Sequence, residues 1–454
     1  MIIYVFYVDV KNEHKMTVEF FALVHCPDGT AVGISSTLLT YVQRFKDGAG
    51  VSWLWLKWVA FGTDGPTVMT GKEGVHNKIR EFKDYLVGVH CVGHRTALAA
   101  NDTFAHPTVP FCANLDEFLR ALGRFYSWST ERRVELKALA HDNDDPETQV
   151  GMACATRWLS RDGASTSVLE KYTSITQQHY DGQESNSTSL GLYKKLTDCK
   201  YFAGLAAVAD VLAVMAGLSR TFQAHVLDGY TIRKGIDDYK TGMLKYTTAG
   251  STTGEGAPYF GPNLTSLVDS IGDAYSAGTA QNFLLSEHGF EVSFSNTKRD
   301  FIEGFAKALA EAALERIDER FPDVPLLEAF DIFDVRRLPD TIPENYGKAE
   351  ITLLHGHFKH LIQVPLDVAI TEWEGFLTEL RRRPGGETFQ ATYSFLNGKH
   401  GLGSRMQSAS CFFFTQHAQP AQPAQHAQHA QHAQHAQHAQ HAQHAQLHDC
   451  IVAT

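Results

Sequence analysis

The chain has 454 residues, of which 43% are hydrophobic and 20% are charged, and its formal net charge is -11. This composition is typical of globular proteins, and the length is enough for two or three domains of about 150 residues each. The acidic balance argues against tight nonspecific binding to nucleic acid, because phosphate contacts need clustered Lys and Arg. The 7 cysteines are odd in number and lack CxxC pairs, which is typical of a reducing compartment.

The first part of the chain alternates strands and helices. Short apolar segments that alternate or are rich in Val and Trp predict strands at 2–10, 16–25, 51–62 and 85–94. Apolar residues at helical spacing predict helices at 33–45, 73–82, 94–104 and 115–128. The first two strands form a hairpin in this interpretation. The order of the elements predicts an α/β layer architecture over 1–150.

The middle of the chain is expected to be helical. Apolar residues three and four apart predict one long helix over Leu190–Phe222, and a second over 298–321 ends before Pro322. We therefore expect the chain to be mainly helical over 151–383, the range that the family resemblance described below makes a helical insertion with return helices. No run of about 18 uninterrupted apolar residues is present, so the sequence predicts no membrane span.

The end of the chain is repetitive. Consecutive His-Ala-Gln triplets run from His426 to Gln446. A three-residue period with few apolar residues builds no packed face, so we expect the tail 384–454 to be disordered. The tract can bind metal weakly, but a repeat expansion without a selected role is the simpler interpretation.

Asp64 is the first candidate for chemistry, because it lies in a Gly-rich turn directly after an apolar strand. Metal-dependent nucleases place carboxylates at strand ends, and they need several of them to hold two Mg²⁺ ions about 3.5–4 Å apart. Cys91 and His94, at CxxH spacing, are a second candidate. As half of a zinc site they would need two more ligands, and a packed cysteine is the alternative.

Five segments occur in an order that resembles a known family. They read FGTDGPTVMTGKEGVHNKI, HCVGHRTALAAND, FYSWSTERR, TRWLSR and LTDCKYFAGLAAVADVLAVMAGLSRTFQ. Together they resemble the hAT superfamily of DNA transposases, and more closely its domesticated vertebrate relatives among nuclear proteins. The resemblance covers about Ile2 to Arg383.

The resemblance implies an RNase H-like mixed sheet interrupted by a large all-helical insertion. It implies that Asp64 stands at the second metal-binding aspartate of the family. It also implies that Cys91 and His94 match the CxxH element near the active site, where the histidine helps to handle the cleaved DNA end.

The same resemblance implies contacts with nucleic acid. Trp158 matches a tryptophan that stacks on a flipped base in active enzymes, and base stacking on an aromatic ring contributes about 1–3 kcal/mol. Arg95 and Arg157, like His94, are then candidates for contacts with DNA, the two arginines through phosphates.

Two catalytic carboxylates of the family have no match here. The first aspartate of the family precedes the strand matched by Ile2–Val10, and nothing after Arg383 resembles the segment with the final glutamate. The zinc-binding module of the family is not matched either. One aspartate cannot hold two cations, so we expect a vestigial Asp64, no cofactor, and Mg²⁺ only with residual activity.

The sequence thus predicts a catalytically inactive, hAT transposase-derived nuclear protein. We expect it to act through protein partners or self-association, with at most weak DNA contact, no membrane and no small-molecule substrate. The alternatives are an active metal-dependent transposase or nuclease, a non-functional gene fragment, and a cytoplasmic location.

Overall fold

The structure is a computed structural model. It describes residues 1–9, 15–44, 55, 57–151, 153, 159–223, 229–247, 259–284, 290–322, 324–333, 337–339, 341–362, 364–381 and 451–453. These residues divide into two compact units. Unit 1 comprises Met1–Arg95, Phe222–Lys234 and Asp323–Thr454, and unit 2 comprises Thr96–Thr221 and Gly235–Pro322.

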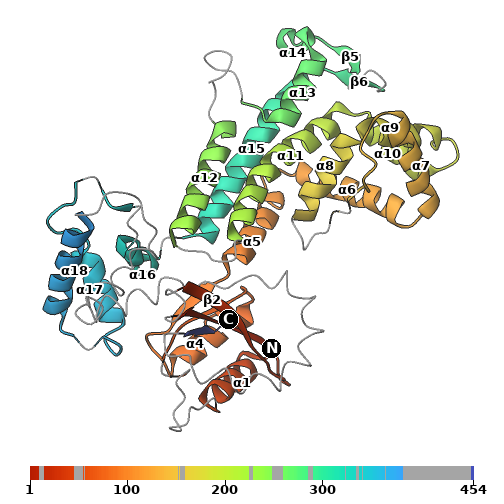
Figure 1. Cartoon of the computed structure of the whole chain (residues 1–454). Coiled ribbons are helices and arrows are strands. Elements are labelled where there is room, and N and C mark those ends of the chain that lie inside the picture. Colours follow the sequence, from red (N-terminus) through yellow and green to blue (C-terminus); the bar gives the residue numbers. More distant parts are fainter. Residues whose placement is uncertain are drawn as a thin grey trace. The chain divides into compact units, whose positions relative to one another are not determined.

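Unit 1 holds a mixed sheet with helices (Figure 1). Its elements are β1 (Ile2–Asp9), β2 (Lys15–Leu23), α1 (Ala31–Arg44), β3 (Trp58–Thr63), α3 (Thr67–Thr70), α4 (Val75–Arg80), β4 (Val87–His90), α16 (Pro325–Glu328), the 3-10 helix η1 (Ala329–Phe333), α17 (Lys348–His357), α18 (Leu366–Arg381) and β7 (Ile451–Ala453).

The strand order of the sheet is β2-β1-β7-β3-β4. β1 and β2 form the antiparallel hairpin that the sequence predicts, from Ile2 opposite Leu23 to Asp9 opposite Lys15. β3 and β4 are parallel, with Thr63 opposite His90. Parallel neighbours end at the same edge of a sheet, so the residues that follow β3 and β4 lie close together.

Both faces of this sheet are covered. On one face Phe6, Ala60 and Val89 join a buried cluster with side chains of η1, α17 and α18. On the other face Val5 and Phe61 join a cluster with side chains of α1 and α4. Alternate residues of a strand point to opposite faces, which explains why neighbours such as Val5 and Phe6 belong to different clusters.

The tail has one described element. β7 lies between β1 and β3, antiparallel to β1 and parallel to β3. The rest of the tail, for which we expect disorder, lies outside the described residues.

The described residues of unit 2 are helical apart from one pair of antiparallel strands. Its elements are α6 (Phe111–Ser127), α7 (Thr130–Asp142), α8 (Leu159–Glu170), α9 (Tyr172–Asp181), α10 (Ser187–Leu196), α11 (Cys199–Phe222), α13 (Pro262–Ile271), α14 (Asp273–Ala277), the antiparallel strands β5 (Gln281–Leu284) and β6 (Glu291–Phe294), and α15 (Asn296–Arg320). Helices α5 (Val92–Phe104) and α12 (Gly229–Thr247) begin in unit 1 and continue into unit 2.

The helical unit begins earlier than the expected boundary at residue 150. Most of α5, and all of α6 and α7, belong to it, although they follow the strands in sequence. The physical reason is packing. At the start of α6, the ring of Phe111 lies 5.1 Å from the rings of Tyr201 and Phe301, which come from α11 and α15.

The expected long helix over Leu190–Phe222 is two helices. α10 ends at Leu196, and α11 begins at Cys199. Between them the Asp198 carboxylate accepts the N–H of Lys200 at 3.0 Å, which is the hydrogen bond of a helix N-cap. Apolar spacing continues across this junction, so periodicity alone did not reveal the break.

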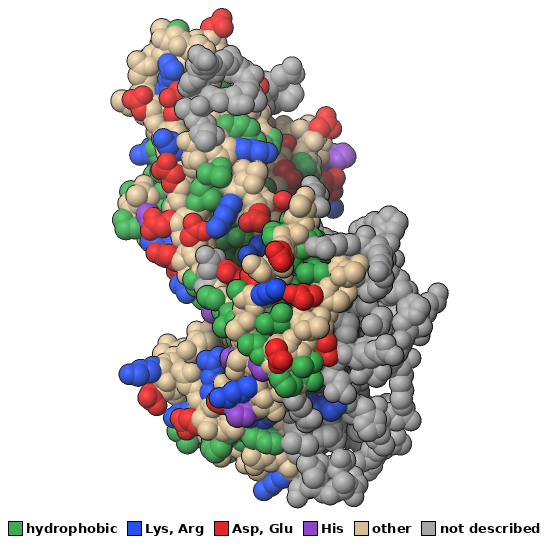
Figure 2. Space-filling view, turned by 90° about the vertical axis from the view of Figure 1, so that its left-hand side faces the viewer, with side chains coloured by type: hydrophobic (Ala, Val, Ile, Leu, Met, Phe, Trp, Pro, Cys, Tyr) green, Lys and Arg blue, Asp and Glu red, His purple; other side chains and the backbone are tan. Residues whose placement is uncertain are grey.

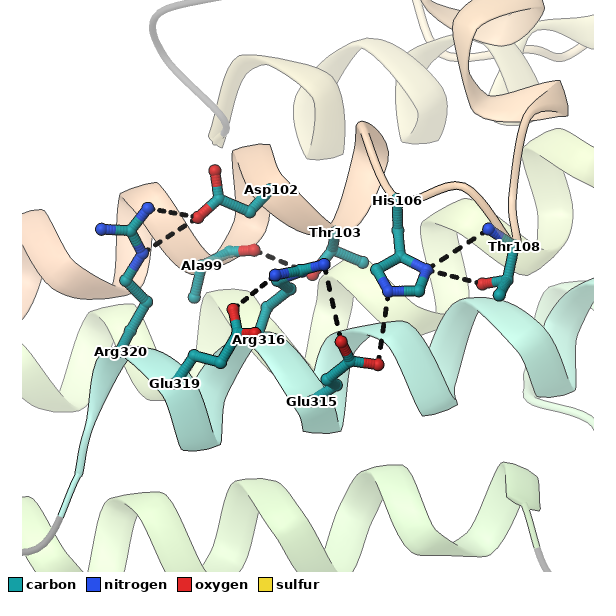
Figure 3. A network of polar contacts seen from close by, with 9 residues as sticks. All are labelled: Ala99, Asp102, Thr103, His106, Thr108, Glu315, Arg316, Glu319 and Arg320. Carbon is teal, nitrogen blue, oxygen red and sulfur yellow. Dashed lines mark hydrogen bonds and ion pairs between the residues drawn. The ribbon is translucent and has the colours of Figure 1, made fainter.

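Polar contacts join α5 to α15 within unit 2 (Figure 3). The guanidinium of Arg320 donates to Asp102 Oδ2 at 2.9 Å and 2.5 Å. Just beyond α5, His106 Nε2 lies 3.3 Å from Glu315 Oε2. These contacts fix the packing of two helices that are remote in sequence.

Helix α11 is long and apolar enough to cross a membrane by length and composition. Its residues are also largely buried against the other helices of unit 2, from Ala203 to Leu218. The core helix of a globular unit has the same composition, because such a helix is apolar on all sides.

The described part of the chain is therefore mostly helical with small sheets. The expectation of an α/β layer holds for unit 1, and that of a large helical region holds for unit 2.

Candidate functional site

Asp64 lies one residue beyond the end of β3, where the sequence analysis placed it. Its side chain is exposed. On the neighbouring strand, Cys91 follows β4, and its N–H donates to the carbonyl oxygen of Thr63 at 2.8 Å. The carboxyl ends of two parallel strands thus bring Asp64 and Cys91 to one edge of the sheet, which we call the Asp64 edge.

A hydrogen-bond chain fixes the backbone at this edge. The Thr63 hydroxyl donates to the carbonyl oxygen of Asp64 at 2.9 Å. The same hydroxyl lies 2.9 Å from Nε2 of His76. Its single proton is used toward Asp64, so His76 Nε2 must carry a hydrogen and donate to Thr63.

The environment of His76 keeps this imidazole neutral. The side chain is buried, and its ring lies 5.0 Å from that of Phe61. Burial, with a smaller contribution from the nearby Arg80 charge, lowers the pKa of His76 to about 4. A neutral imidazole that donates to a hydroxyl supplies no positive charge to a phosphate at pH 7.

Cys91 caps the helix that follows it. Helix α5 begins at Val92, and the Cys91 sulfur accepts hydrogen bonds from the backbone N–H groups of Gly93 and His94. Burial raises the pKa of the Cys91 thiol, and the Asp64 charge adds to this, while the two N–H groups oppose it. The CxxH spacing therefore reflects the geometry of an N-cap, with a neutral thiol at pH 7.

Two further histidines complete the Asp64 edge. The ring of His90 lies 5.6 Å from that of His94 on α5. The His90 ring also lies against Gly65, where a Cβ atom would approach it to 2.2 Å. A side chain at position 65 would therefore have to displace the His90 ring of β4.

The remaining predicted site residues are those proposed to contact DNA. His94 and Arg95 lie in the first turn of α5, and both are half-buried. Arg157 and Trp158 lie outside the described residues. The structure therefore brings Asp64 close to the start of α5 and gives no position for the predicted stacking tryptophan.

The Asp64 edge offers few oxygen ligands. In the parts of the chain that the structure describes, no group of three or more His, Cys, Asp and Glu side chains is arranged to hold a metal ion. The side chains that frame Asp64 are a hydroxyl, imidazoles and a thiol, whereas Mg²⁺ prefers carboxylate and carbonyl oxygens.

A neighbouring arginine has a structural role that the sequence analysis missed. Arg161, in the TRWLSR segment, donates from Nε to Asp116 Oδ1 at 2.7 Å and from Nη2 to Oδ2 at 3.0 Å. It also donates to Asn101 at 2.6 Å. Arg161 and Asp116 are both buried, so this bidentate pair stabilises the packing of α5, α6 and α8.

Sequence reasoning also missed His76 and His90. Both were visible in the segments GVHNKI and VGVHC, but their roles depend on contacts across the sheet. His90 lay inside the predicted strand 85–94, directly before Cys91, and this neighbourhood was the signal that the sequence offered.

No protein-family model and no solved structure matches this chain. The resemblance to the hAT transposases thus depends on the order and spacing of the sequence motifs. The geometry of the Asp64 edge is an independent basis for a functional proposal.

The described residues on the face shown in Figure 2 form no broad area of Lys and Arg side chains. On the face shown in Figure 2, the described acidic and basic side chains are interspersed. This mixture agrees with the net charge of -11. Tight binding to the phosphate backbone would need a concentration of Lys and Arg.

Proposed function

We propose that this protein is a catalytically inactive derivative of an hAT transposase that acts in the nucleus through contacts with other proteins. The observation that carries the proposal is the composition of the Asp64 edge. Around the aspartate stand Thr63, His76 and Cys91, which are used in internal hydrogen bonds and are uncharged at pH 7.

This composition does not suit two-metal hydrolysis. Two Mg²⁺ ions about 3.5–4 Å apart need several shared carboxylate oxygens, so that attacking and leaving oxygens are both stabilised. A thiol with a raised pKa and a buried neutral imidazole do not replace those oxygens. Asp64 is therefore a vestigial residue in this proposal, with no resident cofactor.

The arrangement of the chain also supports the proposed origin. A mixed sheet with an antiparallel hairpin and a parallel pair is followed by a large helical unit, after which the chain returns to the first unit through η1, α17 and α18. This is the order that the resemblance implies for a sheet domain with a helical insertion.

Contact with proteins is supported by exposed apolar side chains on unit 2. Trp128, at the end of α6, is 80% exposed, and Val134 on α7 is 64% exposed. Tryptophan is enriched among the residues that dominate binding energy at protein interfaces. An exposed tryptophan at a helix corner is therefore the candidate anchor for a protein partner.

Retention of nuclear proteins tests this proposal. We expect the immobilised full-length chain to retain a defined protein from nuclear extract, and Trp128→Ala to reduce its retention at least tenfold, equivalent to about 1.4 kcal/mol. Phe82→Ala is the matched control, because Phe82 is 62% exposed but lies in unit 1. Equal retention by all three chains, or none by the unchanged chain, would contradict the proposal.

A further inference from the structure

The corner between α6 and α7 presents an uncovered tryptophan to solvent. Trp128 ends α6, and Ser129 is the N-cap of α7. Trp128 is 80% exposed, whereas Trp58 and Trp373 of unit 1 are buried. We give the name Trp128 corner to four side chains of these two helices: Arg124, Trp128, Arg133 and Val134.

The sequence of α7 explains why its own chain leaves Trp128 uncovered. A hydrophobic residue before an N-cap often packs against an apolar residue at the fourth position of the helix. In α7 the fourth residue is Arg133. Its guanidinium donates from Nη2 to Thr130 Oγ1 at 3.0 Å. The position that would cover the Trp128 ring thus carries a cation.

Two cations of the Trp128 corner have no carboxylate partner. Arg124 is exposed and lies one helical turn before Trp128, on the same side of α6. Its Nε donates to the carbonyl oxygen of Arg120 at 3.2 Å. Within the described part of the chain, neither Arg124 nor Arg133 forms an ion pair, whereas Arg120 lies 2.9 Å from Asp116. The corner therefore offers two positive charges to a partner.

The neighbouring carboxylates of α7 are directed elsewhere. Glu135 accepts a hydrogen bond from Gln178 Nε2 at 2.9 Å, which holds its carboxylate toward α9. Glu131 is exposed, but at 3.6 residues per turn it lies about 160° around α7 from Arg133. A carboxylate from another molecule would thus meet a charge that this chain leaves uncompensated.

These features define the chemistry of the partner. A large apolar side chain on Trp128 and Val134 would remove apolar surface from water. Carboxylates beside the two arginines would form charge-assisted hydrogen bonds, which are stronger than neutral ones. A nucleic acid fits less well, because its successive phosphates need more clustered cations than the corner provides, and the net charge of the chain is -11.

We propose that the Trp128 corner binds an acidic segment of a partner protein that carries at least one large apolar side chain. The apolar side chain packs on Trp128 and Val134, and flanking carboxylates pair with Arg124 and Arg133. This inference rests on the proposed role in protein contact and specifies the chemistry of the partner at the same site.

Binding of a labelled synthetic peptide to the full-length chain tests the inference. The probe is Asp-Glu-Leu-Phe-Asp-Glu, and the readout is fluorescence anisotropy. We expect Trp128→Ala and the double variant Arg124→Glu/Arg133→Glu each to weaken binding at least tenfold. Lys240→Glu/Lys307→Glu is the matched control, because it changes the net charge equally on α12 and α15 of unit 2. It should bind the probe as the unchanged chain does.

Charge reversal separates direct contact from a folding defect. The basic peptide Lys-Arg-Leu-Phe-Lys-Arg should bind the Arg124→Glu/Arg133→Glu chain at least tenfold more tightly than the unchanged chain, because the pairs are restored with opposite signs. The Lys240→Glu/Lys307→Glu chain should show no such gain. The peptide Asp-Glu-Ser-Ser-Asp-Glu should bind the unchanged chain at least tenfold more weakly than the probe, since it lacks the apolar side chains.

Four results would overturn the inference. They are no binding of the acidic probe, unchanged affinity in Trp128→Ala or in the arginine variant, an equal gain of the basic peptide in the control chain, and Trp128-dependent binding of oligothymidylate that is tighter than that of the probe. The last result would assign the corner to nucleic acid.

Failure of this inference is separable from failure of the proposed function. Trp128-dependent retention of a nuclear protein that Arg124→Glu/Arg133→Glu leaves unchanged would refute the acidic chemistry alone. Peptide binding that depends on Trp128 and on both arginines, without retention of any nuclear protein, would refute the proposed function alone.

Discussion

Gly65 illustrates how single residues determine the Asp64 edge. The turn that presents Asp64 passes so close to β4 that a Cβ atom at position 65 would lie 2.2 Å from the His90 ring. Next to it, Thr63 holds the Asp64 carbonyl and the His76 ring in one hydrogen-bond chain. The position of the aspartate is therefore set by packing and neutral hydrogen bonds.

Gly65→Ala should displace the His90 ring or the turn. Overpacking of a close contact typically costs about 1–3 kcal/mol, so we expect urea denaturation to show a loss of stability of that size. Gly163→Ala is the control. A Cβ atom there meets nothing within 4 Å, and Gly163 lies inside α8, so alanine should stabilise by about 1 kcal/mol. Equal stability of both variants would contradict the close packing at Gly65.

The sequence identified Asp64 because it lies in a Gly-rich turn after a short apolar run, and Cys91 because of its CxxH spacing with His94. It did not identify His76, whose role depends on a hydrogen bond to Thr63 across 13 residues of chain. Nor did it show that Cys91 caps α5, because CxxH spacing fits both a metal ligand pair and an N-cap. Such roles are fixed by tertiary contacts, which spacing alone does not encode.

At the level of elements, short polar interruptions decide where helices begin and end. Asp198 separates α10 from α11 by accepting the N–H of Lys200 at 3.0 Å. The start of α13 is capped in a similar way. There the carboxylate of Asp210, which lies on α11, accepts hydrogen bonds from the N–H groups of Asn263 and Leu264, each at 3.0 Å. Carboxylates at helix starts satisfy N–H groups that have no partner within the helix.

Asp198→Ala should weaken the start of α11. Loss of an N-cap side chain typically costs about 1 kcal/mol, and we expect a fall in unfolding free energy of that size. Asp198→Ser should restore most of it, since serine also caps. Hydrogen exchange at Lys200 and Tyr201 localises the effect. Faster exchange throughout unit 2, or no change in either variant, would contradict the capping role.

Helices and strands were predicted accurately where the apolar periodicity lay within one element. The β1-β2 hairpin alternates clearly, and α15 is long and ends before Pro322, so both were predicted close to their observed bounds. The start of the helical unit was misplaced, because α6 and α7 resemble the helices of an α/β layer in sequence. Tertiary contacts assign them to unit 2: Phe111 of α6 packs on α11 and α15, and Gln178 of α9 donates to the carbonyl oxygen of Arg132 on α7.

Over the whole molecule, each unit contains a buried histidine that resists protonation. In unit 1 the pKa of His76 is about 4, mainly because of burial. In unit 2 the pKa of His179 is lowered to about 3, again mainly by burial, with a smaller effect of the Arg132 charge. His179 packs against Phe125 at 4.5 Å between ring centroids.

These pKa values predict acid destabilisation. The unfolded histidines bind protons below about pH 6.5, whereas the folded ones remain neutral to about pH 4, so stability is complete above pH 6.5 and falls as the pH decreases below it. Each contributes at most about 1.4 kcal/mol per pH unit. His76→Gln and His179→Gln should each flatten the pH dependence of urea denaturation between pH 6.5 and 4.

His25→Gln is the control for this experiment, because the His25 side chain is exposed near the end of β2. It should leave the pH dependence unchanged. An equal slope for all four chains would show that neither buried histidine controls acid stability.

The central claim is that the Asp64 edge does not catalyse metal-dependent DNA cleavage. Nicking of supercoiled DNA, measured in Mg²⁺ and in Mn²⁺ with the full-length chain and with Asp64→Asn, tests it most directly. The account predicts the same background rate for both chains, with and without metal. Metal-dependent nicking that disappears in Asp64→Asn would contradict it.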